Sequence, residues 1–265
     1  MQIHHIRNAT FVIHSKDNYI LVDPMLSNKG EIPPFSYIKH KLLKNPTVNF
    51  TKNSQDILNK VTHCLITHSQ TFGIKAFQHT DHLDKKGEEF LIRKNIPVTS
   101  IKKDENYLKK QGLNMVSGLN LWEKESFLDG YITAVPATHG YGWVHKLMAN
   151  GAGYFIELKD EPTIYISGDT VLTADVKNAI EKFQPELTVV AAGNASIDIG
   201  NDLLMNIDEV IEFIKLSPKK VLANHMEALN HCPITREDLK SKLEEHNLSN
   251  KVFIPLDGEE IEFNS

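Results

Sequence analysis

Histidine and aspartate side chains recur in this sequence at the ends of short apolar segments. Four such segments, ending in CLIT, AVPAT, YISG and VLAN, are followed directly by one of these residues: His68, His139, Asp169 and His225. A fifth cluster, HTDH, precedes a charged segment and contains His79, Asp81 and His82. If the apolar segments are buried strands, these side chains lie on loops that a rigid scaffold holds in place. One such histidine is usually a packed or solvated residue, but the recurrence at successive segments favours a shared site.

This mixture of residues favours a catalytic metal site. Neutral imidazole and carboxylate groups are ligands suited to Zn²⁺, Mn²⁺ or Fe²⁺. Metal sites that have histidine and carboxylate ligands and an open coordination position are typical of catalysis, whereas structural zinc sites are rich in thiolates. Two metals about 3.5–4 Å apart can share a water molecule and lower its pKa. The chain has only two cysteines, Cys64 and Cys232, so we expect no disulfide scaffold and a reducing, cytoplasmic setting.

The elements that must position these residues are predicted from hydrophobic periodicity and turn signals. We expect strands within 11–15, 18–24, 61–68, 97–101, 130–140, 151–158, 163–169, 186–193 and 219–225. We expect helices within 82–95, 104–112, 173–183, 207–217 and 235–247. Residues 251–263 are predicted to form a hairpin around Asp257-Gly258. Residues 24–57 carry proline, glycine and polar clusters, and we interpret them as a long loop that borders a pocket.

Length and composition bound the class of protein. The chain has 265 residues, of which 41% are apolar and 24% charged, and we interpret residues 1–265 as a single globular domain without a low-complexity linker. The net charge is −5 and no stripe of lysine and arginine stands out, so we do not expect a nucleic-acid partner. We also expect no membrane partner, because no apolar run approaches the roughly 18 residues of a membrane span. A small-molecule substrate is the expected partner, and self-association stays open.

The ordered set of residues resembles a known superfamily. Together with ILVDPMLS, ATHGYG, YISGDT and NHMEALNHC, it is similar to the metallo-β-lactamase-fold hydrolases, in a bacterial branch that resembles ascorbate-6-phosphate lactonases. The resemblance spans nearly the whole chain. It implies an α/β (α+β) fold, a four-layer αββα sandwich of the metallo-β-lactamase type, with two divalent metal ions at one edge. Zinc is the expected metal and manganese the alternative.

The resemblance also implies a role for each residue. One metal takes three ligands: His68, His79 and His139. The other metal takes three more: Asp81, His82 and His225. Asp169 bridges the two metals, and Asp81 also transfers a proton, so both carboxylates count as catalytic residues.

The sequence departs from the superfamily motif at one place. The superfamily has one residue between the first two histidines, whereas ten residues, Ser69 to Gln78, separate His68 from His79 here. Three interpretations stay open. The segment bulges out and His68 still binds metal; or His68 is displaced and one metal is lost or weakly held; or the insertion has removed catalysis. Segment TFGIKAF is apolar enough to form a flap beside the pocket, or to pack on the surface.

The expected function is a metal-dependent hydrolase that uses metal-activated hydroxide on a small lactone or ester. A phosphodiesterase is the enzymatic alternative, and a non-catalytic metal- or ligand-binding protein is the alternative from another class. His231 and Tyr141 are candidate substrate contacts, with packing roles equally open. Asp23 is expected to support a ligand or simply to end its strand. The substrate and the identity of the metal do not follow from the sequence.

Overall fold

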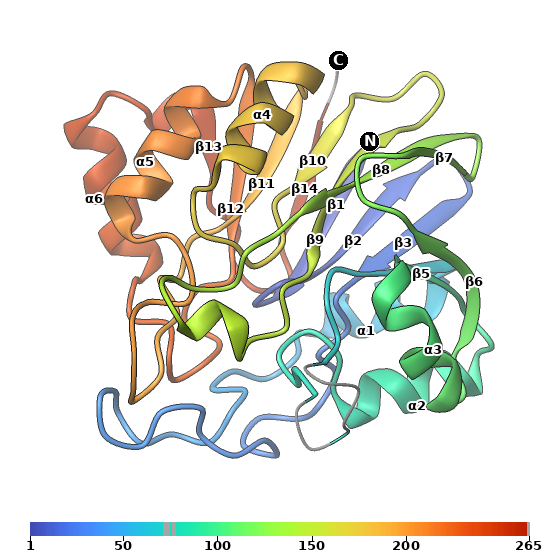
Figure 1. Cartoon of the computed structure of the whole chain (residues 1–265), viewed down its shortest axis with the longest axis horizontal. Coiled ribbons are helices and arrows are strands. Elements are labelled where there is room, and N and C mark those ends of the chain that lie inside the picture. Colours follow the sequence, from blue (N-terminus) through green and yellow to red (C-terminus); the bar gives the residue numbers. More distant parts are fainter. Residues whose placement is uncertain (71–74, 76–77, 264–265) are drawn as a thin grey trace.

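The computed structural model describes residues 1–70, 75 and 78–263 and contains two mixed β-sheets that face each other (Figure 1). Within these residues the first sheet has seven strands in the order β14 (Glu260–Glu262), β1 (Gln2–Arg7), β2 (Thr10–Ser15), β3 (Asn18–Val22), β4 (His63–Ile66), β5 (Pro97–Ile101) and β6 (Asn114–Leu119). The second sheet has seven strands in the order β13 (Val252–Phe253), β12 (Lys220–Asn224), β11 (Leu187–Ala191), β10 (Ile164–Ile166), β9 (Ala152–Glu157), β8 (Gly130–Pro136) and β7 (Lys124–Phe127).

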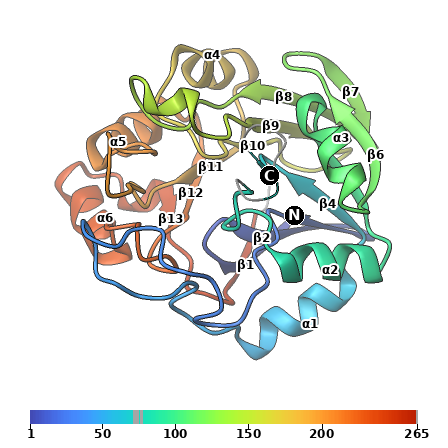
Figure 2. The same cartoon turned by 60° about the horizontal axis from the view of Figure 1, so that its bottom comes forward.

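Helices cover the outer face of each sheet. The first sheet carries α1 (Lys52–Lys60), α2 (Lys85–Arg93) and α3 (Lys102–Lys110), and the second carries α4 (Ala174–Phe183), α5 (Ile207–Leu216) and α6 (Arg236–Glu245) (Figures 1 and 2). The short 3₁₀ helices η2 (Val144–Lys146) and η3 (Ser249–Lys251) lie in connections between the described elements. None of the helices within the described ranges is both long enough and apolar enough to span a membrane.

Three apolar layers hold the sheets and helices together. Phe11, Tyr154 and Leu222 belong to the layer between the two sheets. Leu91 and Leu108 pack α2 and α3 on the first sheet, and an equivalent layer packs α4, α5 and α6 on the second. Burial of apolar surface is the main stabilising force in such a sandwich. The four-layer αββα fold expected from the sequence is therefore confirmed.

Most helices begin at a side-chain cap. Thr51, Asp84 and Thr173 each accept a hydrogen bond from a backbone N–H in the first turn of α1, α2 and α4. Asn206 and Thr235 form full capping boxes at α5 and α6. These caps fix where each chain segment leaves a strand-end loop and enters a helix.

Strand direction places the strand-end loops at one edge. Strands β3, β4, β5 and β6 are parallel neighbours in the first sheet, and so are β10, β11, β12 and β13 in the second. Strand β8 runs antiparallel to β9, which runs antiparallel to β10, so β8 and β10 point the same way. The carboxyl ends of β4, β8, β10 and β12 therefore meet at one edge of the sandwich, where ligands bind in open sheets of this kind.

The hairpin predicted at the C-terminus is wrong. Strand β13 pairs in parallel with β12, whereas β14 pairs antiparallel with β1, so the chain crosses from the second sheet to the first. Gly258 does form a turn, with φ of 80°, but its N–H donates to the carbonyl of His5 rather than across a hairpin. The loop predicted over 24–57 is also too long, because α1 already begins at Lys52. Strands β1, β6 and β7 were not predicted, since β6 and β7 are half-exposed and lack a long apolar run.

Candidate metal centre

Four connections between elements bring the predicted residues together, and the one between β4 and α2 carries His68 and the HTDH residues. His68 lies two residues beyond the end of β4, and His139 and Asp169 lie three residues beyond β8 and β10. His225 follows β12 directly and has a left-handed backbone, with φ of 59°. His79, Asp81 and His82 lie in the loop before α2, whose first turn is capped by Asp84. All seven side chains meet at the shared edge of the two sheets.

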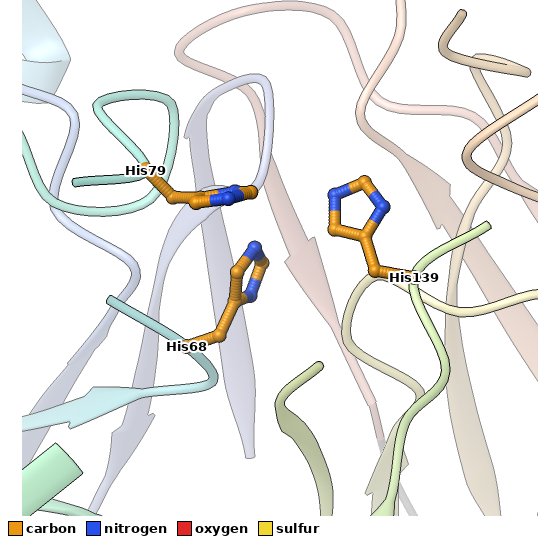
Figure 3. Close-up of side chains that lie close together, drawn as sticks. All are labelled: His68, His79 and His139. Atoms are coloured by element: carbon orange, nitrogen blue, oxygen red, sulfur yellow. The ribbon is translucent and has the colours of Figure 1, made fainter. Parts of the chain in front are cut away.

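Three of these histidines form one cluster (Figure 3). Each of His68, His79 and His139 offers one ring nitrogen, and these atoms all lie within 4.8 Å of one another. The ring centroids of His68 and His79 are 4.9 Å apart, and each ring lies 5.4 Å from that of His139. His68 and His139 are buried, whereas His79 is partly exposed.

A second cluster lies beside the first. The ligand atoms of its members all lie within 4.8 Å of one another: Asp81, His82, Asp169 and His225. All four residues are buried. The His82 and His225 rings are 5.4 Å apart, and the His82 ring is 4.0 Å from that of His68.

Asp169 lies between the two clusters. Its Oδ2 atom is 3.0 Å from His82 Nε2 and 3.4 Å from His225 Nε2. The same oxygen is 3.5 Å from His139 Nε2, which belongs to the three-histidine cluster. Asp169 Oδ2 therefore contacts histidines of both clusters.

Asp23, at the end of β3, orients His82. Its Oδ2 lies 2.9 Å from His82 Nδ1 and accepts a hydrogen bond from the Thr67 hydroxyl, while its Oδ1 accepts from the Thr67 N–H. The Nδ1–H of His82 is thereby committed to Asp23, and Nε2 faces Asp169 and Asp81. A carboxylate behind a histidine in this way fixes the tautomer for metal binding. The supporting contact predicted for Asp23 is confirmed.

Asn8, in the β1–β2 turn, fixes the backbone of two further residues of the second cluster, Asp81 and His225. Its side-chain amide donates to the Asp81 carbonyl, and its own carbonyl accepts from the N–H of His225. The N-terminal turn thus ties the loop before α2 to the end of β12.

The electrostatics of the two clusters differ. Burial lowers the pKa of His68, His79 and His139, and that of His139 falls to about 3, so these rings are neutral near pH 7. Burial is the largest effect on His82 and His225 and opposes their charge, but Asp169 together with Asp23 and Asp81 beside His82, and with Cys232 beside His225, raises the pKa of each well above its usual value. Those two rings in turn hold the pKa of Asp169 well below the ordinary range, against the effect of burial.

The buried donor atoms fit a metal ion. Among the described residues, three buried atoms of the two clusters have no hydrogen-bonding partner: His68 Nε2, His139 Nδ1 and Asp169 Oδ1. Three more, His82 Nε2, His225 Nε2 and Asp169 Oδ2, make no regular hydrogen bond and contact only other members of the clusters at ion-pair distances. Buried polar atoms are normally paired, because an unpaired one costs about 1–3 kcal/mol. Imidazole nitrogens and carboxylate oxygens are the ligands of divalent transition metals. The donor set therefore suits such metals without rearrangement.

The ten-residue insertion leaves His68 beside His79. The His79 N–H donates to the carbonyl of Ser69 at 2.9 Å, and Gln70 and Gln78 form an antiparallel bridge. The segment thus leaves and returns at adjacent points, and His68 stays in the cluster. Metal binding by His68 remains a prediction. The flap proposed for TFGIKAF falls largely on residues 71–74 and 76–77, outside the described residues.

A pocket of about 250 Å³ opens beside both clusters. Its polar lining residues are Gln78, His79, Thr80, Asp81, His139 and His231, and its apolar lining residues are Phe35, Leu147, Met148, Ile197 and Leu203. Among the residues that the structure describes, no lysine or arginine lines it. Phe35 belongs to the loop after β3, so the prediction that this loop borders a pocket is confirmed.

The two candidate substrate residues lie in different places. His231 is buried, lines the pocket and packs edge-to-face on Phe35 at 5.0 Å between ring centroids. Tyr141 is not part of that lining. Its hydroxyl donates to Glu209, and the residue borders a separate shallow depression with Lys39 and Asp202. His231 therefore lines the pocket beside the clusters, whereas the Tyr141 hydroxyl binds Glu209 away from it, and substrate contact by either residue stays a prediction.

Comparison with known proteins identifies relatives of full length. No protein-family profile matches the chain. The UPF0173 protein YddR of Bacillus subtilis is 30% identical over 267 residues, covering 99% of this chain and 100% of its own. A UPF0173 metal-dependent hydrolase of Methylacidiphilum infernorum is 28% identical and covers 94% of each chain.

Solved structures agree with these relatives. The isothiocyanate hydrolase from Delia radicum gut bacteria superposes with a TM-score of 0.87 at 29% identity, covering 100% of both chains. A possible metal-dependent hydrolase from Veillonella parvula gives 0.86 at 28% identity, covering 98% of both chains. The metallo-β-lactamase fold protein YhfI of Bacillus subtilis, 12% identical with a TM-score of 0.62 and 98% coverage of both chains, shares the fold alone. The chain therefore belongs to the UPF0173 family of metal-dependent hydrolases and has the metallo-β-lactamase fold.

Proposed function

We propose that this hydrolase holds two divalent metal ions, one in each cluster, and acts on a small, uncharged electrophile with an apolar tail. The unpaired, buried donor atoms that converge in the two clusters carry the metal part of the proposal. One ion takes three ligands: His68, His79 and His139. The other takes three: Asp81, His82 and His225. Asp169 lies between them and binds both, with zinc expected and manganese as the alternative.

The pocket wall supports an uncharged substrate. Five apolar side chains line the cavity, and the lining that the structure describes contains no lysine or arginine. A phosphate or carboxylate that the metals do not bind themselves normally needs lysine, arginine or a helix N-terminus. The lining therefore gives no support to a substrate with an anionic group away from the metals, whereas an uncharged lactone stays compatible with it.

An isothiocyanate, R–N=C=S, fits both the pocket and the activity named for the structural relative from Delia radicum gut bacteria. Its central carbon is electrophilic, the group is uncharged, and R can be apolar. In the proposed reaction water adds its oxygen to the central carbon and a proton goes to nitrogen. The carbon–nitrogen bond then breaks as the second proton of the water also moves to nitrogen, which gives the amine R–NH₂ and carbonyl sulfide.

The bound metals supply polarisation of the substrate and a lowered pKa for the attacking water. The chain's own residues do the rest. Asp81 belongs to a cluster and also lines the pocket, so its carboxylate is placed to accept a proton from water and return it to the leaving nitrogen. The imidazole of His231, which also lines the pocket, contacts the substrate. Phe35, Leu147 and Ile197 hold the tail and exclude water.

The test combines metal content with substrate preference. Purified chain is reconstituted with Zn²⁺ or Mn²⁺, and metal per chain is measured by mass spectrometry. The loaded protein is then assayed on an alkyl isothiocyanate, an uncharged lactone and a phosphodiester. We expect two equivalents of metal and the highest kcat/KM on the isothiocyanate.

The variant His82→Ala should lose metal and roughly 100-fold in kcat/KM, because it removes a metal ligand and the ring nearest to Asp169. The matched control is His246→Ala, since His246 is exposed at the end of α6. Absence of bound metal after reconstitution contradicts the metal proposal, and a preference for the charged phosphodiester contradicts the substrate proposal.

A further inference from the structure

Helix α3 begins beside the three-histidine cluster and places a buried carboxylate there. Asp104 has no exposed surface and accepts hydrogen bonds from the Ser69 N–H at 2.9 Å and the Ser69 hydroxyl at 2.7 Å. Its second oxygen accepts from the side-chain amide of Gln70 at 3.2 Å. Ser69 directly follows His68, so the backbone that carries His68 is fixed on α3.

The same helix face holds the returning end of the insertion. Tyr107, three residues beyond Asp104 and on the same side of the helix, donates from its hydroxyl to Gln78 Oε1 at 2.7 Å. Gln78 in turn donates to the carbonyl of Leu83 at 2.6 Å. Because His79 directly follows Gln78, both histidines that flank the insertion are held by one helical turn of α3.

A third contact from α3 reaches the other sheet. Lys103 donates from its ammonium group to the carbonyl of Asn150. Asn150 Oδ1 accepts from the backbone N–H of His139 at 2.9 Å, and its amide donates to the carbonyl of His145. Through Asn150, α3 therefore also holds the loop that carries His139.

The other cluster is held by a different set of residues. Asp23 binds His82, and Asn8 binds the backbone of Asp81 and His225. These partners lie on β3 and on the β1–β2 turn, at a distance along the chain from α3. The contacts from α3 are thus distinct from those of Asp23 and Asn8. The two sets meet at the Thr67 hydroxyl, which donates to Asp23 and lies 3.1 Å from His68 Nδ1.

We infer that Lys103, Asp104 and Tyr107 are positioning residues for the three-histidine metal site and set its metal affinity separately from that of the neighbouring site. The inference rests on the proposed two-metal function. It explains how a ten-residue insertion is accommodated between two ligands, since both of its ends are hydrogen-bonded to one rigid helix. Residues that orient metal ligands typically change metal affinity 10–100-fold when they are replaced.

The experiment is a Zn²⁺ titration of the full chain in competition with a chromophoric chelator. Wild-type protein should bind two equivalents. Asp104→Asn keeps one acceptor oxygen but loses the other, and it should weaken one equivalent about 10–100-fold while the other keeps its wild-type affinity. The matched control is Glu105→Gln, which removes a carboxylate from the next residue of α3. Among the described residues, the ion pairs of Glu105 are with Lys102 and Lys109 only.

Two further variants separate positioning from folding. Tyr107→Phe keeps the ring and removes only the hydroxyl, so it should weaken the same equivalent by a smaller factor without lowering the melting temperature of the metal-free protein by more than a few degrees. In a His139→Ala background, where the three-histidine site is already lost, Asp104→Asn should leave the remaining equivalent unchanged.

Several results would overturn the inference. One is two equivalents of wild-type affinity in Asp104→Asn, and another is equal weakening of both equivalents. Failure of wild-type protein to bind any zinc would instead refute the proposed function on which the inference depends.

Discussion

Replacing Asp23 by asparagine tests how the protein prepares His82 for metal. The Asp23 carboxylate accepts three hydrogen bonds, from the Thr67 N–H at 2.8 Å, the Thr67 hydroxyl at 2.8 Å and His82 Nδ1 at 2.9 Å. An amide that keeps its oxygen toward the Thr67 N–H presents its NH₂ group to His82. The imidazole then keeps its proton on Nε2, the nitrogen that faces Asp169 at 3.0 Å. A protonated Nε2 cannot bind metal.

The magnitude follows from these contacts. Loss of a partner behind a histidine ligand weakens metal binding about 10–100-fold, which corresponds to about 1.4–2.7 kcal/mol. The Thr67 hydroxyl can reverse and accept from the new amide, so the metal-free protein loses mainly one charge-assisted hydrogen bond, worth about 1.5–3 kcal/mol of stability. Asp23 also contributes to the raised pKa of His82, and its loss reduces proton competition for the ring. That effect opposes the weakening at neutral pH and disappears at higher pH.

The assay for Asp23→Asn is a competitive Zn²⁺ titration at pH 7 and pH 8.5, with urea unfolding in the presence of a chelator. One equivalent should weaken at both pH values, and more strongly at pH 8.5. The control is Asp56→Asn, because Asp56 is exposed on α1. Unchanged zinc affinity in Asp23→Asn at both pH values would refute the reasoning about the tautomer.

Three further predictions concern pH, packing and the link between the sheets. Because the pKa of His82 and His225 is raised, metal must displace protons at their cluster, and the zinc affinity of this site should fall as the pH is lowered through neutrality. The three-histidine cluster, whose histidines have a lowered pKa, should keep its zinc affinity to lower pH. Zinc titrations between pH 6 and 8 that show parallel declines at both sites would contradict this prediction. A Cβ on Gly193 would lie 2.0 Å from the His225 carbonyl oxygen, so Gly193→Ala should displace the end of β12 and reduce bound zinc, measured by mass spectrometry. Tyr154 donates to the Ile66 carbonyl at 2.7 Å across the two sheets, and Tyr154→Phe should cost about 0.5–1.5 kcal/mol in urea unfolding, since Ser100 still satisfies that carbonyl.

The strands that could be predicted are those buried on both faces. Strands β4, β11 and β12 read as continuous apolar runs, and nearly all of their side chains are buried. Strands β6 and β7 lie at sheet edges with mostly half-exposed or exposed side chains, so their sequences carry little apolar signal.

The C-terminal error shows the limit of local signals. The turn at Asp257-Gly258 is real, but the choice of pairing partner belongs to the whole fold. Residue Glu262 of β14 pairs with Gln2 of β1, at the other end of the chain. Sequence periodicity contains no information about that distant partner.

The cluster residues could be predicted because a strand end needs only its own strand to be placed. Their supporting partners could not. Asn8 contacts Asp81 from 73 residues away, and Asp104 contacts Ser69 from 35 residues away. The apolar wall of the pocket likewise combines Phe35 with side chains of two later loops. Only the folded chain brings such residues together.

Anomalous diffraction from a crystal of zinc-loaded protein tests the central claim most directly. The account predicts two zinc peaks. One lies among the rings of His68, His79 and His139, and the other lies among Asp81, His82 and His225, with Asp169 in contact with both. A single peak, or a peak that leaves His68 without contact to metal, would contradict the two-metal centre.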